Sequence, residues 1–153
     1  MDFTRAGFGD IDMLVKARQS YLLTDFDTVP ESVVAALPDY FEKHLNKELF
    51  AFLCTENGKL VGSAFLLVTA KPPSPAFPSG KVGSVLNVYT APEYRRRGVA
   101  KTLMGMLIDE AEKMRLDHIE LKATDDGYPL YKALGFADEH SHYRDMRYDF
   151  DKK

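Results

Sequence analysis

The chain has 153 residues, of which 45% are hydrophobic and 28% charged, and its formal net charge at pH 7 is −3. This composition is typical of a soluble globular domain long enough to bury a core, and it excludes the disordered and fibrous classes. The negative net charge gives no support to a general nucleic-acid-binding role, which needs an excess of basic residues. The sequence therefore predicts a single domain over residues 1–153.

The N-terminal residues carry charges at Asp2, Arg5 and Asp10 and contain no long apolar run. We therefore expect neither a signal peptide nor a membrane span, and the cytoplasm is the expected location. The single cysteine, Cys54, excludes an internal disulfide and lies in an apolar run, where buried packing is expected and a catalytic thiol is the alternative. The histidines show no helix-spaced metal pair; His140 and His142 could face one side of a strand, but exposed loop histidines are expected there and no metal site is predicted.

The first part of the chain predicts a short strand and two helices. Residues 2–6 form an extended start, and Asp10 is a candidate N-cap for a helix that ends near Thr24. A second helix is expected over residues 31–46, with a break near Pro38, because proline lacks the N–H that a helix interior uses.

Two apolar runs, residues 48–55 and 59–69, flank Asn57-Gly58. Because both of these residues tolerate a positive φ, the pattern favours an antiparallel hairpin. Residues 71–80 contain four prolines and predict an irregular loop, which either borders a functional site or only connects two strands.

The second part of the chain alternates strands and helices. Residues 82–90 are rich in β-branched and aromatic side chains, which suits a strand. The pattern then predicts, in order, an amphipathic helix over residues 99–115, a strand over 118–124, a short helix over 128–134 ended by Gly135, and closing strands within 136–150, the last over 143–150. This order predicts an α/β (mixed α+β) fold in which helices flank a mixed sheet.

A basic loop joins the strand over residues 82–90 to the helix that follows. Arg95, Arg96 and Arg97 precede Gly98 at the expected helix start. The first N–H groups of a helix have no partner within it, and the helix dipole makes this end positive. Gly98 permits backbone conformations that a side chain would block. We therefore expect the loop to bind an anion, most simply a phosphate or pyrophosphate, and a run of arginines that only covers the surface is the alternative.

Two motifs resemble landmarks of a known family. Residues 95–100 (Arg-Arg-Arg-Gly-Val-Ala) resemble the acetyl-CoA pyrophosphate loop of the GNAT superfamily of N-acetyltransferases, Arg/Gln-x-x-Gly-x-Gly/Ala. Residues 130–136 (Leu-Tyr-Lys-Ala-Leu-Gly-Phe) are similar to the Leu-Tyr-x-x-x-Gly-Phe that closes the cofactor site in that family. The resemblance implies the GNAT fold, a mixed and mostly antiparallel sheet of about six to seven strands flanked by about four helices.

The resemblance also implies acetyl-CoA as co-substrate, bound largely by main-chain groups. Backbone N–H groups of the loop would bind the pyrophosphate, and arginine side chains would add charge. The strand before the loop would pair with the pantetheine arm, and an N–H near Val88 or Tyr89 would polarise the thioester carbonyl. The residues implied in cofactor binding are Val88, Tyr89, Thr90, Arg95, Arg96, Arg97, Gly98, Val99, Ala100 and Tyr128.

Tyr131, the tyrosine of the second motif, is the implied catalytic residue. Relatives place a phenol there beside the thioester sulfur, and a phenol with an ordinary pKa of about 10 can protonate a departing thiolate. Tyr128, one turn earlier, is the competitor for this role. No pairing of a nucleophile with a base is recognisable in the sequence, so direct attack of the amine in a ternary complex is expected.

Two positions depart from the family's pattern. Many relatives place a glutamate base on the strand before the loop, where this chain has Asn87, which cannot take a proton but could hold a water or bind substrate. Thr124 stands where relatives often have a cofactor-binding asparagine. Asp25, Asp27 and Glu31 are candidates for the base or for binding the amine, with solvated surface as the alternative, and the amine could also lose its proton to water.

The sequence leaves three functions open. N-acetylation of an amine by acetyl-CoA is the leading hypothesis. A non-catalytic acyl-CoA-binding sensor and a GNAT-fold enzyme using another acyl-CoA are the alternatives, because the loop contacts the phosphates of CoA and not its acyl group. The acceptor is an amine of unidentified kind, and the net charge of −3 slightly favours a cationic one. No nucleic-acid or membrane partner is expected, and the resemblance allows a homodimer.

Overall fold

The computed structural model describes residues 1–151, and the chain divides into two compact units, Met1–Lys122 and Ala123–Lys153. The elements of the first unit are β1 (Asp2–Arg5), α1 (Ile11–Asp25), α2 (Glu31–His44), β2 (Leu49–Glu56), β3 (Lys59–Ala70), β4 (Lys81–Thr90), α3 (Val99–Lys113) and β5 (Ile119–Glu120), with 3-10 turns at Phe8–Asp10 and Pro92–Tyr94. The sequence-based prediction of one domain over residues 1–153 stays a prediction.

The strands of the first unit form one mixed sheet in the order β1-β2-β3-β4-β5. Neighbouring strands from β1 to β4 are antiparallel, and β5 pairs with β4 in parallel. The mixed, mostly antiparallel architecture is therefore confirmed. The described residues contain five strands and not six to seven, because the closing strands expected within residues 136–150 do not form.

The hairpin of β2 and β3 forms where the sequence predicts it. Asn57 and Gly58 have φ values of 52° and 74°, and Glu56 lies opposite Lys59 across the turn. Two consecutive positive φ values match the right-handed twist of the flanking strands, which explains why this dipeptide fixes the register.

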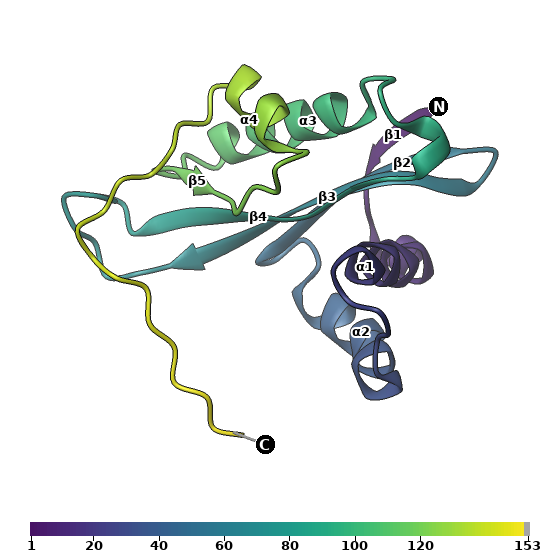
Figure 1. The fold of residues 1–153 in the computed structure, drawn as a ribbon, viewed down its shortest axis with the longest axis horizontal. Helices are drawn as coiled ribbons and strands as arrows, with labels where there is room; N and C mark the ends of the chain where they lie inside the picture. Colours follow the sequence, from purple (N-terminus) through teal and green to yellow (C-terminus); the bar gives the residue numbers. More distant parts are fainter. Residues whose placement is uncertain (152–153) are drawn as a thin grey trace. The chain divides into compact units, whose positions relative to one another are not determined.

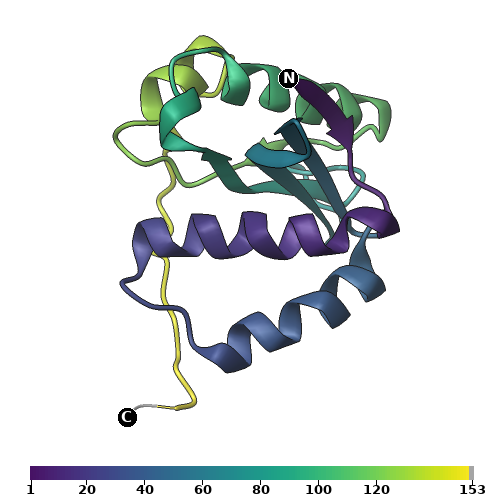
Figure 2. The same ribbon diagram turned by 90° about the vertical axis from the view of Figure 1, so that its right-hand side faces the viewer.

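Helices cover both faces of this sheet. Helix α3 lies along one face, and α1 and α2 lie together against the other (Figures 1 and 2). On the α1–α2 side, Leu14 of α1, Phe41 of α2 and Phe65 of β3 belong to one buried cluster. The buried residues of α3 are Val99, Leu103, Met104, Leu107 and Ala111, which confirms the expected apolar face. Each fully buried leucine contributes about 1.5–3 kcal/mol through removal of its surface from water.

Helix α2 runs without interruption through Pro38, so the break expected there is wrong. Proline removes one hydrogen bond to the carbonyl one turn earlier, that of Val34. Pro38 is exposed, so the region of this lost bond is accessible to water. The buried Phe41 and half-buried Leu37 pack on the core and hold the helix in place.

In the second unit, residues 123–151 contain one helix, α4 (Tyr128–Ala133). It ends before Gly135, whose φ is 103°, as the sequence predicts. The closing strands expected within residues 136–150 are absent from the described part of the chain. The alternation of apolar and polar residues there resembles a strand, but a strand also needs a ladder partner. Without one, the apolar side chains stay in solvent, and Met146 and Phe150 are 92% and 96% exposed.

Candidate functional site

The loop between β4 and α3 presents an array of main-chain donors. Arg96 and Gly98 have φ values of 63° and 77°, and Gly98 is the N-cap of α3. The backbone N–H groups from Arg96 to Lys101 have no hydrogen-bond acceptor among residues 1–151. Free N–H groups at the positive end of a helix bind anions. The geometry therefore fits the phosphate-binding loop expected from the sequence.

The three arginine side chains of the loop are exposed. Arg95 Nε donates to the carbonyl oxygen of Thr90 at 3.3 Å, and the guanidinium carbon of Arg97 lies 5.2 Å from the centre of the Tyr94 ring. Within residues 1–151, none of the three forms an ion pair with an acidic side chain closer than 4.0 Å. The loop thus keeps its positive charge available to an external anion.

Tyr94 fixes the start of this loop to the end of β2. Its hydroxyl group donates to Glu56 Oε2 at 2.6 Å. This hydrogen bond raises the pKa of the Tyr94 phenol and lowers the pKa of the Glu56 carboxyl, because it stabilises the protonated phenol and the ionised carboxylate. The bond connects segments 38 residues apart, so it limits how far the loop can move from the hairpin.

The edge of β4 that faces β5 is open along the segment leading to the loop. β4 pairs with β5 only at Gly83 and Ser84, and no further pairing on that side occurs among residues 1–122. From Val85 to Thr90, β4 is therefore a strand with one paired edge and one open edge. An open edge offers N–H and C=O groups to an extended ligand.

A bulge interrupts the pairing of β4 with β3, on the side of β4 away from the open edge. The register between β3 and β4 shifts between Ser63 and Phe65, and Asn87 has a φ of 56°. The side-chain amide of Asn87 donates to the carbonyl oxygen of Ala17 and to Ser63 Oγ, each at 3.1 Å. Its Oδ1 accepts from Arg18 Nη1 at 3.3 Å, and Ser63 Oγ donates to the Asn87 carbonyl at 2.8 Å.

The polar side-chain groups of this bulge are hydrogen-bonded inside the protein. Asn87 and Ser63 are 2% and 0% exposed, and both amide hydrogens of Asn87 are used. The option that Asn87 donates to a substrate or a water is therefore wrong. Its structural effect is to bond β4 to α1 and β3, which fixes the direction of the open edge.

Gly62 of β3 allows the N-terminus of α3 to approach the sheet. A Cβ atom at this position would lie 2.8 Å from the Tyr89 carbonyl oxygen and 2.8 Å from Val99 Cγ1. Both distances are shorter than real contacts, so any larger residue would push the helix start away from β4. No local sequence pattern marks Gly62 for this role, because its neighbours here come from β4 and α3.

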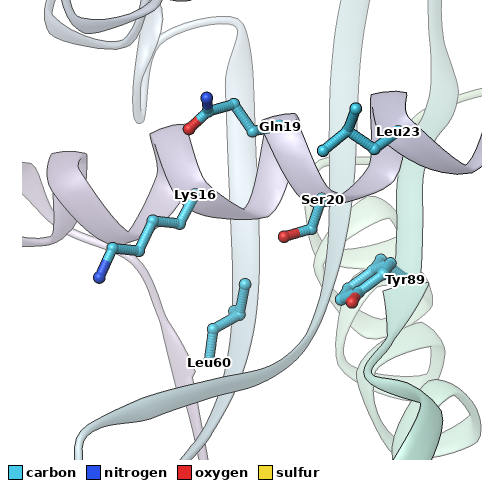
Figure 3. Close-up of a pocket in the computed structure, with 6 residues that line it drawn as sticks. All are labelled: Lys16, Gln19, Ser20, Leu23, Leu60 and Tyr89. Carbon is cyan, nitrogen blue, oxygen red and sulfur yellow. The ribbon is translucent and has the colours of Figure 1, made fainter. Parts of the chain in front are cut away.

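A cleft of about 330 Å³ lies between α1 and the strands. Its lining residues are Lys16, Gln19, Ser20 and Leu23 of α1, Leu60 of β3 and Tyr89 of β4. Figure 3 shows Ser20 and Leu23 beside the Tyr89 ring, with Leu60 between Lys16 and Tyr89 in this view. Tyr89 thus belongs both to the segment with the open edge and to the wall of the cleft.

The second unit holds the two tyrosines predicted from the second motif. The Tyr131 ring packs edge-on against Phe136 at 5.9 Å between ring centres. The Tyr128 hydroxyl donates to Asp138 Oδ2 at 2.7 Å, which raises the pKa of Tyr128. Just before α4, Thr124 Oγ1 accepts a hydrogen bond from the Gly127 N–H at 3.1 Å.

The family model for the acetyltransferase (GNAT) family matches residues 14–136. The chain belongs to this family. The assignment made from the two motifs, with its enzyme class of acyltransferases and its fold, is therefore confirmed.

Known relatives of this GNAT chain include a glucosamine 6-phosphate N-acetyltransferase of Trypanosoma brucei brucei, which is 32% identical over 94 residues. That match spans 60% of this chain and 58% of the relative. A solved structure of a predicted acetyltransferase with acetyl-CoA from Clostridium acetobutylicum is 28% identical, with a TM-score of 0.82 and 95% of each chain covered. A GCN5-related N-acetyltransferase from Ralstonia eutropha JMP134 is 24% identical, with a TM-score of 0.74 and coverage of 95% and 97%, and supports the fold alone.

The remaining candidates of the GNAT chain lie apart from the loop. Cys54 is buried in β2, which confirms its packing role, and burial raises the pKa of its thiol. Asp25, Asp27 and Glu31 lie exposed at the connection of α1 and α2 and do not line the cleft. The loop over residues 71–80 is irregular as predicted, and its role at a site stays a prediction.

Among residues 1–151, no helix combines the length and apolarity needed to cross a membrane.

Proposed function

We propose that this chain transfers the acetyl group of acetyl-CoA to a primary amine. The observation that supports this best is the combination of the open edge of β4 with the unpaired N–H groups of Arg96–Lys101 at the start of α3. An extended thiol arm that ends in a pyrophosphate needs such a strand edge followed by an anion-binding helix start. Family membership and a similar structure with acetyl-CoA point to the same ligand.

In this proposal, the backbone from Val88 to Thr90 binds the pantetheine arm, and an N–H near Val88 or Tyr89 polarises the thioester carbonyl. The N–H groups of Arg96–Ala100 bind the pyrophosphate, while the Arg95 N–H donates to the Pro92 carbonyl oxygen, and the exposed arginine side chains add charge. The bulge at Asn87 supports this by holding β4 to α1, as its hydrogen bonds to Ala17 and Arg18 indicate. The N–H groups of Arg96–Lys101 break no internal hydrogen bond when the ligand arrives, which favours binding.

Acetyl-CoA supplies an activated acetyl group as a thioester. The chain's residues then have to orient a neutral amine for attack on the carbonyl carbon, so that a C–N bond forms and the C–S bond breaks. We assign Tyr131 the role of giving its phenolic proton to the departing thiolate. Tyr128, whose hydroxyl donates to Asp138, is the competitor for this role. Direct attack is consistent with the burial of Cys54.

The proton of the acceptor amine goes to water or to a carboxylate in this proposal. Asn87 cannot accept it, because an amide is not basic. Three exposed carboxylates lie near the connection of α1 and α2: Asp25, Asp27 and Glu31. They stay candidates for the base on the ground of this position alone. An amine whose pKa is already low would need no protein base.

The acceptor is a primary amine, and glucosamine 6-phosphate is one candidate because a curated relative acts on it. A non-catalytic acyl-CoA sensor and an enzyme for another acyl-CoA are the alternatives. Isothermal titration with acetyl-CoA and with CoA, followed by thiol release with a panel of amines, separates them. Binding with amine-dependent thiol release would support the acetyltransferase. Binding of acetyl-CoA without release by any amine would favour the sensor, and absence of binding would refute the proposal for the loop.

Replacing Tyr131 by phenylalanine tests the general acid. We expect kcat to fall about a hundredfold or more, with the Kd for acetyl-CoA nearly unchanged, because general acids contribute this much to turnover. Tyr143→Phe is the matched control, since Tyr143 is 77% exposed in the same unit. An unchanged rate for Tyr131→Phe would remove the residue from the mechanism.

A further inference from the structure

The cleft beside Tyr89 has a mixed lining. Leu23, Leu60 and the Tyr89 ring are its apolar groups, and Lys16, Gln19 and Ser20 are its polar groups, with Ser20 among the apolar ones in Figure 3. Lys16 is the only charged residue in this lining, and no acidic residue lines the cleft. The described lining of the cleft therefore carries a net positive charge.

The charge of Lys16 is not neutralised by the protein. No carboxylate oxygen of residues 1–151 lies within 4.0 Å of its amino group, and this includes Asp12, one turn earlier on α1. Arg18, the other cation nearby on α1, also has no acidic partner and donates to the neutral amide of Asn87. Residues two apart on a helix lie on nearly opposite sides of it, so Arg18 does not add its charge to the cleft, and Lys16 alone gives the lining its positive potential.

This cleft adjoins the reacting end of the cofactor if the proposed function holds. The main chain at Tyr89 is the expected partner of the thioester carbonyl, and the side chain of the same residue forms a wall of the cleft. An acceptor whose amine reaches the thioester would then extend along the cleft toward α1. Its remaining groups would meet the apolar wall and Lys16.

We propose that Lys16 is a specificity-determining residue that binds an anionic group, a carboxylate or a phosphate, on the amine acceptor. An ammonium attracts such a group and repels a second cationic group, so polyamines are disfavoured. The same positive charge lowers the pKa of the acceptor's own amine, which favours the neutral form that attacks. This local charge opposes the slight preference for a cationic acceptor that the net charge of −3 suggests.

Matched pairs of amines that differ in one anionic group test this inference. Glucosamine 6-phosphate against glucosamine probes a phosphate, and 4-aminobutanoate against its amide probes a carboxylate. Binding of each amine is followed by ligand-observed NMR titration, with and without CoA, for the wild type, Lys16→Met and Lys16→Glu. Methionine keeps the helix propensity and the length of the lysine chain. Lys113→Met, on α3 and exposed, is the control with the same change in net charge.

We expect the anionic member of at least one pair to bind the wild type about five- to tenfold more tightly, as for a partly exposed ion pair with a hydrogen bond. This advantage should vanish in Lys16→Met, reverse in Lys16→Glu and persist in Lys113→Met. The pair that shows it identifies a phosphate or a carboxylate. Equal binding within both pairs, no binding of either anionic amine, or an advantage that survives Lys16→Met would overturn the inference. Titration with acetyl-CoA alone reports separately on the proposed function, because the amine titrations without CoA do not depend on it.

Discussion

Two stretches, one within β4 and one after it, depart from regular strand geometry. The polar groups of the first are hydrogen-bonded within the protein, and the N–H groups of the second are not. At Asn87, with a φ of 56°, the side chain is buried and each of its polar atoms is hydrogen-bonded inside the protein. At Arg96 and Gly98, with φ values of 63° and 77°, the chain is exposed, and the N–H groups that follow have no acceptor among residues 1–151. Buried polar groups need hydrogen-bond partners within the protein, whereas exposed polar groups are solvated and stay available to a ligand. We therefore expect Asn87 to control stability and the loop to control binding.

The largest expected effect is that of Asn87→Ala on stability. The change leaves the Ala17 carbonyl without this donor and Ser63 Oγ without a partner on that side. It also places an alanine at a positive φ. Orphaned buried polar groups cost about 1–3 kcal/mol each, so we expect the free energy of unfolding to fall by about 2–4 kcal/mol in urea denaturation. Ser84→Ala on the same strand, whose side chain forms no hydrogen bond among the described residues, should change it by less than about 0.5 kcal/mol.

The comparison would fail if Asn87→Ala left the unfolding midpoint unchanged and only weakened cofactor binding. In that case the hydrogen bonds at the bulge would not contribute to the free energy of unfolding, although their burial implies that they do. A fall in stability with a nearly unchanged Kd for acetyl-CoA in the remaining folded protein would support the division of roles.

Gly98→Val is expected to produce the next largest effect, and on binding. A Cβ at Gly98 would meet no atom within 4 Å, so the fold has room for it, but φ is 77°. A β-branched residue avoids this region, so the loop should move and its N–H groups should turn away. We expect the Kd for acetyl-CoA to rise about tenfold or more by isothermal titration, from about 1–2 kcal/mol of strain.

Gly105→Ala is the matched control for this loop variant. Gly105 lies inside α3, has open space around a Cβ and has no positive φ. Alanine there should stabilise the protein by about 0.5–1 kcal/mol and leave binding unchanged. An unchanged Kd in Gly98→Val would show that the conformation of this glycine does not govern the loop.

Arg96→Ala should have a smaller effect on binding and almost none on stability. The Arg96 side chain is exposed and has no ion pair among residues 1–151, so its loss should change the unfolding free energy by less than about 0.5 kcal/mol. We expect the Kd for acetyl-CoA to rise about three- to fivefold at low salt, and by less at high salt, because salt screens exposed charges. Lys113→Ala on α3 is the control, and an equal effect in both variants would refute a local role.

The sequence predicted the elements whose causes are local. Asn57-Gly58 sets the hairpin by its own φ preferences, and Gly98 marks a helix start by its position before a periodic apolar face. Asn87 gave no such signal, because the atom that accepts its amide hydrogen is the carbonyl of Ala17, 70 residues away. Lys16 is exposed on α1, and only the placement of the strands shows that it borders the cleft.

The errors have the same physical origin. Residues 143–150 alternate like a strand, but whether a strand forms depends on a partner that local sequence does not name. β5 was expected over residues 118–124 and covers only Ile119–Glu120, because pairing with β4 ends at Ser84. The fold class and the loop were thus predictable, whereas the end of the strand pairing that opens the edge of β4 was not.

The smallest expected effect concerns how the loop is held at its start. In Tyr94→Phe, the hydrogen bond from the phenol to Glu56 is lost, and this bond is the largest cause of the lowered pKa of Glu56. We expect the pKa of Glu56 to rise toward its ordinary value, measured by NMR titration of the side-chain carboxyl carbon. A carboxyl whose pKa is lowered in the folded state contributes stability above its ordinary pKa and loses it as pH falls through the folded value. Tyr94→Phe should therefore make the protein slightly less stable near neutral pH and less sensitive to acid. Tyr143→Phe should change neither property, and a pKa of Glu56 that stays low in Tyr94→Phe would mean that other charges, such as Arg97, hold the carboxylate ionised.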